Sequence, residues 1–350
     1  MKEVILECFK EFKCIAGECS DNCCIGWEID IDDDTMCYYN TVKDDINDRL
    51  SACISKGDTP HFILDENDRC PFLNKDNLCD IIITLGEDKI PYICKNHPRF
   101  YTWLPDRTET GMGLCCEVSC KLLFASSDKL NTNIPYTLTD ELADVMTYAR
   151  ETAFSILQNR EMPIASRLSI FLDYCEKLDQ HLFFEDAKML KKTADLYKNQ
   201  KEEKITSADS LKEISKLFES LEPIDDKWSK LSCEIHSLQE NITASLPEFQ
   251  QNTQENFYKY EHLAVYFTYR HFLHCLEDYN VFSAGIFIVL STLYCGICDA
   301  YSYMLCKNPR TEENARLYSK QVEYSMENTE RVSDADLKNI KGLLMLVFGR

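Results

Sequence analysis

After about residue 138, hydrophobic residues recur at three- and four-residue steps, the spacing of one face of an α-helix. A first run begins near Thr139. A second follows Pro163, because proline suits the first position of a helix. A third runs from Leu211 to Leu221 and is stopped by Pro223. These runs predict a body built of packed helices.

Two stretches, 257–276 and 281–305, are more apolar than the others, and we expect them at the centre of the helical bundle. The segment 281–298 has no charged residue over 18 positions, which just reaches the length of a membrane span. However, Ser283, Ser291 and Thr292 interrupt it, and no lysine- or arginine-rich flank orients it. We therefore expect a buried core helix, and no membrane partner.

The first third of the chain has a different pattern, with short apolar runs separated by polar turn clusters such as 65–68 and 74–77. No series of alternating strands and helices appears, which argues against a doubly wound sheet. The predicted fold is mainly α. It has a loop-rich N-terminal cysteine-cluster domain over residues 1–125 and a helical-bundle domain over residues 126–350.

Cysteine is concentrated in the N-terminal region, where 13 of the 19 cysteines precede residue 121. Closely spaced thiolates commonly bind zinc or iron–sulfur clusters. The opening segment, with Val4, Ile5 and Leu6 between charged residues, is too short for a secretory signal, so we expect a cytoplasmic protein. Thiols stay reduced in that compartment, which favours a metal site over disulfides.

The chain is acidic, with a formal net charge of −21 at pH 7. Such a charge opposes binding to nucleic-acid phosphates, so no nucleic-acid partner is expected. An acidic surface suits a lysine-bearing partner, although solubility alone is the commoner reason for it. The apolar share of 45% and charged share of 28% are ordinary for a folded soluble protein.

An ordered set of short motifs covers about residues 12–124. The motifs are Phe12-x-Cys14, Cys19-x3-Cys23-Cys24-x-Gly26-Trp27-x-Ile29-x-Ile31, Cys70-Pro71-Phe72-Leu73, Leu78-Cys79-x-Ile81, Leu85-Gly86-Glu87, Ile93-Cys94, Pro98-Arg99 and Leu114-Cys115-Cys116-Glu117. As a set they resemble the flagellin lysine N-methylase family, whose N-terminal part is similar to a zinc- or iron-chelating cysteine-cluster domain. The segment from Leu263 to Leu276, with Arg270, resembles that family more weakly.

The resemblance implies transfer of methyl groups from S-adenosylmethionine to lysine side chains of flagellin. It also implies an iron–sulfur cluster, with 4Fe-4S as the preferred form, or zinc. The implied ligands are Cys14, Cys19, Cys23, Cys24, Cys70, Cys79, Cys94 and Cys116. Family members usually have an aromatic residue where His97 stands, so we expect His97 to pack rather than to bind metal. Cys115 and Cys120 are extra to the set.

Catalytic and S-adenosylmethionine-binding residues stay unassigned, because no glycine-rich loop follows a strand and no Cys-x3-Cys-x2-Cys triplet occurs. Several residues at helical spacing could line a lysine channel: Tyr258, Tyr260, Glu261, His262, Tyr266 and Tyr269. Aromatic residues at that spacing more often form core, which we expect here, with Arg270, His271 and His274 as bundle partners. The alternative function is a non-enzymatic zinc- or iron-binding module for metal handling or partner docking. A third possibility is an electron-transfer protein.

Overall fold

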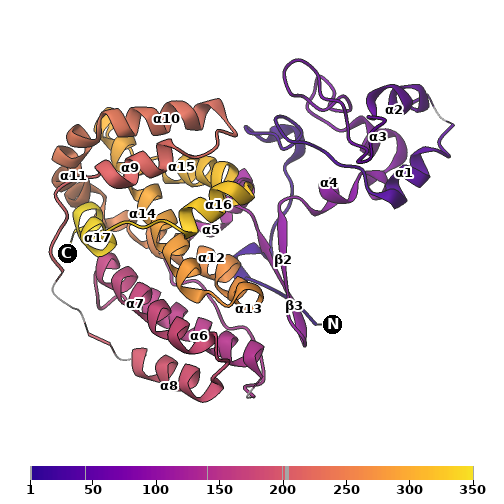
Figure 1. Cartoon of the computed structure of the whole chain (residues 1–350). Helices are drawn as coiled ribbons and strands as arrows, with labels where there is room; N and C mark the ends of the chain where they lie inside the picture. Colours follow the sequence, from indigo (N-terminus) through magenta and orange to yellow (C-terminus); the bar gives the residue numbers. More distant parts are fainter. Residues whose placement is uncertain (1, 44, 140, 199, 202–204, 350) are drawn as a thin grey trace.

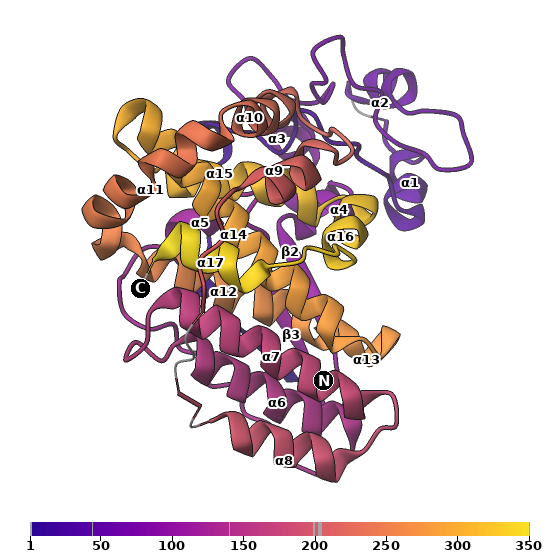
Figure 2. The same ribbon diagram turned by 60° about the vertical axis from the view of Figure 1, so that its left-hand side comes forward.

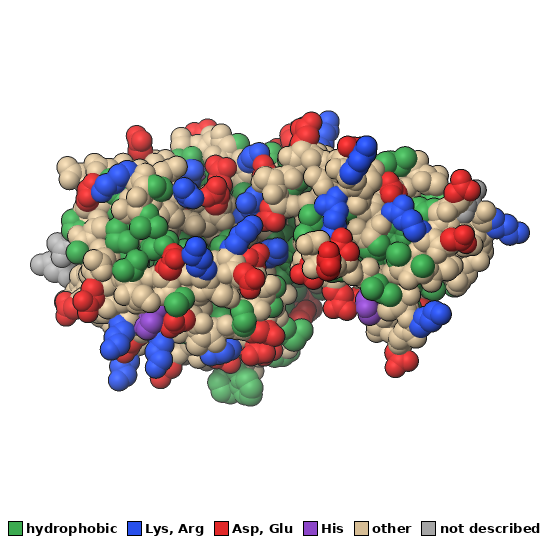
Figure 3. All heavy atoms as spheres, turned by 90° about the horizontal axis from the view of Figure 1, so that it is seen from above, with side chains coloured by type: hydrophobic (Ala, Val, Ile, Leu, Met, Phe, Trp, Pro, Cys, Tyr) green, Lys and Arg blue, Asp and Glu red, His purple; other side chains and the backbone are tan. Residues whose placement is uncertain are grey.

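A large helical body and a smaller lobe stand side by side in Figure 1. The computed structural model describes residues 2–43, 45–139, 141–198, 200–201 and 205–349. The lobe is formed by the early part of the chain, and in both Figure 1 and Figure 2 its helices α1 and α2 lie on the side away from α8. Figure 3 shows positive and negative side chains intermixed on the face seen from above.

The body consists mainly of helices that follow residue 141, as predicted. Its elements are α6 (Leu142–Leu157), α7 (Ile164–Leu182), α8 (Ala187–Tyr197), α9 (Lys212–Glu219), α10 (Asp226–Ser237), α11 (Gln239–Thr253), α12 (Tyr258–His271), α13 (Cys275–Asp278), α14 (Val281–Cys306), α15 (Thr311–Tyr318), a π-helix η6 (Ser319–Glu323), α16 (Met326–Ser333) and α17 (Ile340–Phe348). Pro163 caps the start of α7, and α9 ends before Pro223. The expected helix starts are therefore confirmed to within a few residues.

Helix α14 runs through the centre of the body, where it packs against α7, α11, α12, α16 and α17. Every residue from Phe287 to Tyr303 is buried. By length and composition α14 is the one helix of the described chain that could cross a membrane, and 83% of its most apolar window is buried inside the protein. The prediction that this segment is a core helix is confirmed.

A three-stranded sheet was not predicted. Strand β3 (Arg107–Met112) lies between β1 (Lys2–Ile5), which is parallel to it, and β2 (Arg99–Trp103), which is antiparallel. The buried face of β3 carries charges: Glu109 Oε1 lies 2.9 Å from Arg107 Nε, and Glu109 Oε2 lies 2.7 Å from Arg150 Nη2 of α6. Because charged residues occupy positions that are normally apolar, the strand shows no readable alternation.

The lobe has its own apolar core, separate from that of the body. The lobe contains the helices α1 (Asp33–Tyr39), α2 (Asn47–Cys53), α3 (Asp80–Leu85) and α4 (Tyr92–Asn96). We call it the cysteine lobe and define it as residues 14–98. Its core residues run from Ile29 to Ile90, and the rings of Phe62 and Phe72 lie 4.8 Å apart at its centre. Segments on either side of the lobe, including Phe9 and α5 (Glu117–Leu123), pack into the body instead. The domain boundary at residue 125 stays a prediction.

Candidate functional site

Four of the expected ligands, Cys24, Cys70, Cys79 and Cys94, lie together in the cysteine lobe, and we call them the inner thiols. The backbone brings them together: the Cys70 amide donates a 2.8 Å hydrogen bond to the Cys24 carbonyl, and Cys79 forms a bridge with Leu73. Burial, with a smaller contribution from the neighbouring Cys79, raises the pKa of Cys70 to about 11. Burial and then Cys70 likewise raise the pKa of Cys94. The four thiols are therefore near enough to oppose one another's ionisation.

Three more expected ligands, Cys19, Cys23 and Cys116, form a second group, which we call the outer thiols. Cys116 stands at the N-cap of α5. Burial raises the pKa of Cys19, and Cys116 and Cys23 add to the increase. A side-chain hydrogen bond from Cys24 lowers the pKa of Cys23. Cys23 therefore joins the outer thiols to the inner ones.

Cys14 is the least connected of the eight expected ligands. Its exposed side chain accepts a 3.4 Å hydrogen bond from the Ala16 amide. In the described part of the chain, no three cysteine sulfurs lie within 4.8 Å of one another. The structure thus gathers seven thiols into two adjoining groups without closing a coordination sphere.

The donor chemistry of both groups fits zinc or an iron–sulfur cluster, because soft thiolates select those metals over hard cations. Cys79 and Cys116 both occupy N-cap positions, where the first turn of a helix points its amides outward. Burial raises the pKa of each thiol, and hydrogen bonds from backbone amides of the helix that follows oppose that rise. Helix N-termini therefore offset part of the effect of burial on one thiol in each group.

His97 lies among aromatic rings, next to the extra cysteine Cys115. Its ring centroid is 6.0 Å from that of Trp27 and 6.4 Å from that of Tyr324. Burial lowers the pKa of His97 to about 4. This environment fits the packing role expected for His97.

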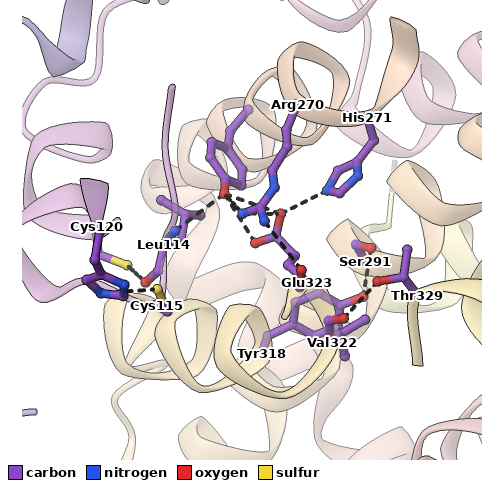
Figure 4. A network of polar contacts seen from close by, with 12 residues as sticks. Leu114, Cys115, Cys120, Arg270, His271, Ser291, Tyr318, Val322, Glu323 and Thr329 are labelled. Carbon is purple, nitrogen blue, oxygen red and sulfur yellow. Dashed lines mark hydrogen bonds and ion pairs between the residues drawn. The ribbon is translucent and has the colours of Figure 1, made fainter. Parts of the chain in front are cut away.

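A buried polar network lies in the helical body, and Figure 4 shows Arg270 and His271 pointing toward Glu323 within it. Its centre is Glu323, the last residue of η6, whose side chain is fully buried. Tyr266 and His271 of α12 donate hydrogen bonds of 3.2 and 2.9 Å to its carboxylate. Arg270 Nη1 lies 3.2 Å from the same group. Burial opposes ionisation of Glu323, but Arg270 and His271 outweigh it and lower the pKa of Glu323.

The network continues from Glu323 toward the cysteine lobe. The Leu114 amide donates a 3.3 Å hydrogen bond to the Tyr266 hydroxyl. The Arg270 guanidinium lies 5.1 Å from the centre of the Tyr324 ring. The centres of the Tyr324 and Trp27 rings are also 5.1 Å apart. Sequence reasoning missed Glu323 and Tyr324. The π-helix η6 ends at Glu323 and is capped by Tyr324, and π-helical turns are often found at functional sites.

Tyr260, Tyr266 and Tyr269 of α12 form core, as expected, and not a lysine channel, whereas Tyr258 at the start of the helix is only partly buried. Tyr260, Tyr266 and Tyr269 are each at most 2% exposed. The Tyr260 hydroxyl donates a 2.8 Å hydrogen bond to Asp299. Glu261 is fully buried and forms ion pairs of 2.8 Å with the partly exposed Arg160 and 2.6 Å with the buried Arg167. These groups are satisfied structural partners.

A groove of about 400 Å³ opens between α10, α14, α15 and the loop that carries Asp21. Asp21 is two residues from Cys19 and two from Cys23, so the groove adjoins the outer thiols. Arg316 of α15 links the segments on this side of the groove through ion pairs: its Nε lies 3.4 Å from Asp21 and its Nη1 lies 3.8 Å from Glu117. The remaining lining mixes charged, polar and apolar side chains: Asp225, Lys227, Leu231, Tyr301, Ser302, Leu305, Cys306, Arg310, Glu313, Asn314 and Leu317.

Comparison with known proteins assigns the helical body to a class of lysine-modifying proteins. The family model described as the FliB lysine N-methylase C-terminal domain matches residues 150–346, more than half of the chain. The chain therefore belongs to the FliB lysine N-methylase family, and the family prediction is confirmed. The matched segment includes α10, α14 and α15 of the groove, and the Glu323 network.

Curated relatives come from Salmonella. Flagellar biosynthetic protein FliU of Salmonella muenchen is 28% identical over 120 residues, which are 32% of this chain and 71% of that protein. The lysine-N-methylases of Salmonella typhimurium and Salmonella choleraesuis are also 28% identical over 120 residues, 32% of this chain, but the match spans 30% of their length. No solved structure matches the chain.

Proposed function

We propose that this protein is a protein-lysine N-methyltransferase that acts on flagellin with S-adenosylmethionine as the methyl donor. The observation that carries the proposal is the groove, in which family-matched helices α14 and α15 face the segment between Cys19 and Cys23. The names of the relatives, a flagellar biosynthetic protein and lysine-N-methylases, support the substrate and the reaction.

The groove is the proposed binding site for S-adenosylmethionine. Its volume of about 400 Å³ lies within the range of small-molecule pockets. Arg310 offers a guanidinium for the carboxylate of the methionine moiety, and Asp225 can accept from its ammonium or from the ribose hydroxyls. Leu231 and Leu305 offer apolar surface for the adenine ring. The lining thus contains a partner for each chemical part of the donor.

Methyl transfer needs a neutral lysine amine aimed at the sulfonium methyl group. The amine nitrogen forms a bond to the methyl carbon as the carbon–sulfur bond breaks, and S-adenosylhomocysteine leaves with the electron pair on sulfur. The amine then loses a proton to a base or to water. Asp21 and Glu313 of the groove lining are the carboxylates beside which that amine would enter.

The cysteines are proposed to hold an iron–sulfur cluster or zinc, in the inner thiols and in the outer thiols together with Cys14. A cluster supplies electron transfer, whereas zinc supplies a structural cross-link of a loop-rich lobe. A metal held by the outer thiols would lie beside the wall of the groove, because Asp21 of the groove lining stands between Cys19 and Cys23. The cytoplasm is the proposed compartment, since the thiols must stay reduced.

The test is methylation by the full-length protein purified without oxygen. Flagellin is incubated with methyl-deuterated S-adenosylmethionine, and mass spectrometry locates labelled lysines. Leu305 is 61% exposed in the groove, so Leu305→Trp fills the groove without disturbing the core. Leu138→Trp, at a position that is 46% exposed and outside the groove, is the matched control.

We expect label in flagellin from the wild type and from Leu138→Trp, and a strong loss from Leu305→Trp. Equal activity in the two variants would remove the groove from the reaction. A metal-loaded wild type that labels no flagellin would favour the metal-binding module.

A further inference from the structure

The geometry points to a second, thiol-free metal site on the cysteine lobe, in which Glu28, Asp30 and His61 bind a divalent transition-metal ion. Their ligand atoms all lie within 4.8 Å of one another. The site is independent of the eight cysteines and of the proposed methyl transfer. Its ligand class is a dication that accepts oxygen and nitrogen donors, such as Mn²⁺ or Zn²⁺.

Two paired extended segments place the three side chains on one face. Asp30 forms an antiparallel bridge with His61, and the Phe62 amide donates a 3.0 Å hydrogen bond to the Ile29 carbonyl. Side chains alternate along extended chain, so Glu28 and Asp30 share a face. The other face carries Ile29 and Phe62, which are 4% and 2% exposed in the lobe core. Because the apolar face is buried in the lobe core, the opposite face, with Glu28, Asp30 and His61, points toward solvent.

The imidazole of His61 is held in place before any metal arrives. Its Nδ1 lies 3.0 Å from Ser55 Oγ and 3.1 Å from the Thr59 carbonyl oxygen, to which it donates, so Nε2 is the nitrogen whose lone pair is left for a metal. The His61 amide also donates a 3.0 Å hydrogen bond to Ser55 Oγ. Such second contacts orient metal-binding histidines in proteins and lower the entropy lost on binding.

The charge of the site suits a dication. The Glu28 side chain is 75% exposed, so an ion can enter from solvent. Over the described residues, no lysine or arginine forms an ion pair with Glu28 or Asp30. Two carboxylates facing one imidazole would balance the charge of the ion and supply three of its ligands.

Manganese binding to the full-length protein, purified without oxygen and with its cysteine-bound metal retained, tests the site. Mn²⁺ prefers oxygen and nitrogen donors over thiolates, and its electron paramagnetic resonance signal falls on binding. The site variant is Glu28→Gln with Asp30→Asn and His61→Gln. The control variant is Asp33→Asn with Asp34→Asn, which removes the same number of carboxylates from exposed positions on the adjacent helix α1.

We expect one strongly bound Mn²⁺ in the wild type and in the control, and at least about tenfold weaker binding in the site variant, as ligand-sphere changes typically cause. The melting temperature should rise with Mn²⁺ in the first two proteins only. Melting without Mn²⁺ shows whether the site variant is folded. Equal Mn²⁺ affinity in a folded site variant and the control would overturn the proposal, as would a wild type that binds only weakly at many places.

Discussion

A Cβ atom added to Gly113 would lie 2.1 Å from the hydroxyl oxygen of Tyr324. Heavy atoms cannot approach so closely, so a side chain at residue 113 must displace the tyrosine. The Tyr324 ring packs against Trp27 of the cysteine lobe and beside Arg270 of the body. The absence of a side chain at Gly113 is therefore what lets lobe and body meet through Tyr324.

The Gly113→Ala variant should loosen this junction. Overpacking of a close contact typically costs about 1–3 kcal/mol, and we expect a loss of that size in the free energy of unfolding by urea. Limited proteolysis should cut between lobe and body earlier than in the wild type. Gly57→Ala is the control, because a Cβ there meets nothing within 4 Å. Indistinguishable stability of the two variants would show that Tyr324 moves without cost.

The buried carboxylate of Glu323 should be a major contributor to stability. Glu323→Gln removes the negative charge that faces Arg270 and His271, and leaves the buried guanidinium without its counter-ion. Breaking a buried ion pair on one side costs about 3 kcal/mol or more, measured as the free energy of unfolding at pH 7.5. Glu327→Gln, on the exposed surface of α16, should change it by less than about 0.5 kcal/mol. Similar values for both variants would contradict the importance of the network.

The helices of the body could be predicted because their apolar faces repeat locally, as in α7 and α14. The small sheet could not, because Glu109 is buried by pairing with Arg150, a residue 41 positions away. The cysteine motifs identified the candidate ligands, but their spacing alone did not show which cysteines belong to the inner thiols and which to the outer thiols. That division depends on the Cys24–Cys70 backbone pairing, and Cys116 reaches Cys23 only through the folded body.

The Glu323 network illustrates the same limit in the site. Arg270 and His271 stood out in the sequence as ionisable residues on an apolar helix, but their partner lies more than 50 residues later. Nothing in the local pattern around Glu323 marks a π-helix, since its hydrogen bonds depend on how the turn packs. Distant contacts of this kind need the tertiary structure.

Asp299 should make stability depend on pH. Burial raises its pKa to about 7 despite hydrogen bonds from Thr311, Asn314 and Tyr260. The folded state therefore holds a proton that the unfolded chain releases near its ordinary value of 3.8. The resulting stabilisation is fully present below pH 3.8 and is lost as the pH rises through 7.

Asparagine at this position mimics the protonated acid, and the facing hydroxyls can turn to accept from its amide. Relative to Asp299→Asn, the wild type should lose up to about 4 kcal/mol of unfolding free energy between pH 4 and pH 7. Urea titrations across this range measure the difference. Asp278→Asn, at an exposed position, controls for the change in net charge. Parallel pH profiles for wild type and Asp299→Asn would mean that Asp299 is ionised throughout.

The arrangement of the thiols predicts how metal is lost when single cysteines are replaced. If the inner thiols and the outer thiols each bind their own metal, replacing a cysteine of one group should release metal from that group only. Cys70→Ser and Cys116→Ser should therefore each remove about half of the bound metal and sulfide. The double variant should remove nearly all of it. Cys233→Ser, at an exposed cysteine on α10 outside both groups, should keep the wild-type content.

Iron, zinc and acid-labile sulfide are measured on protein purified without oxygen. Iron with matching sulfide identifies a cluster, and zinc without sulfide identifies a structural ion. Complete loss from either single variant would mean one site shared through Cys23, the residue that joins the two groups. Metal content equal to that of Cys233→Ser in every variant would mean that these thiols bind no metal. Their crowding would then have to be explained by packing alone, although Cys14 and Cys23 are exposed.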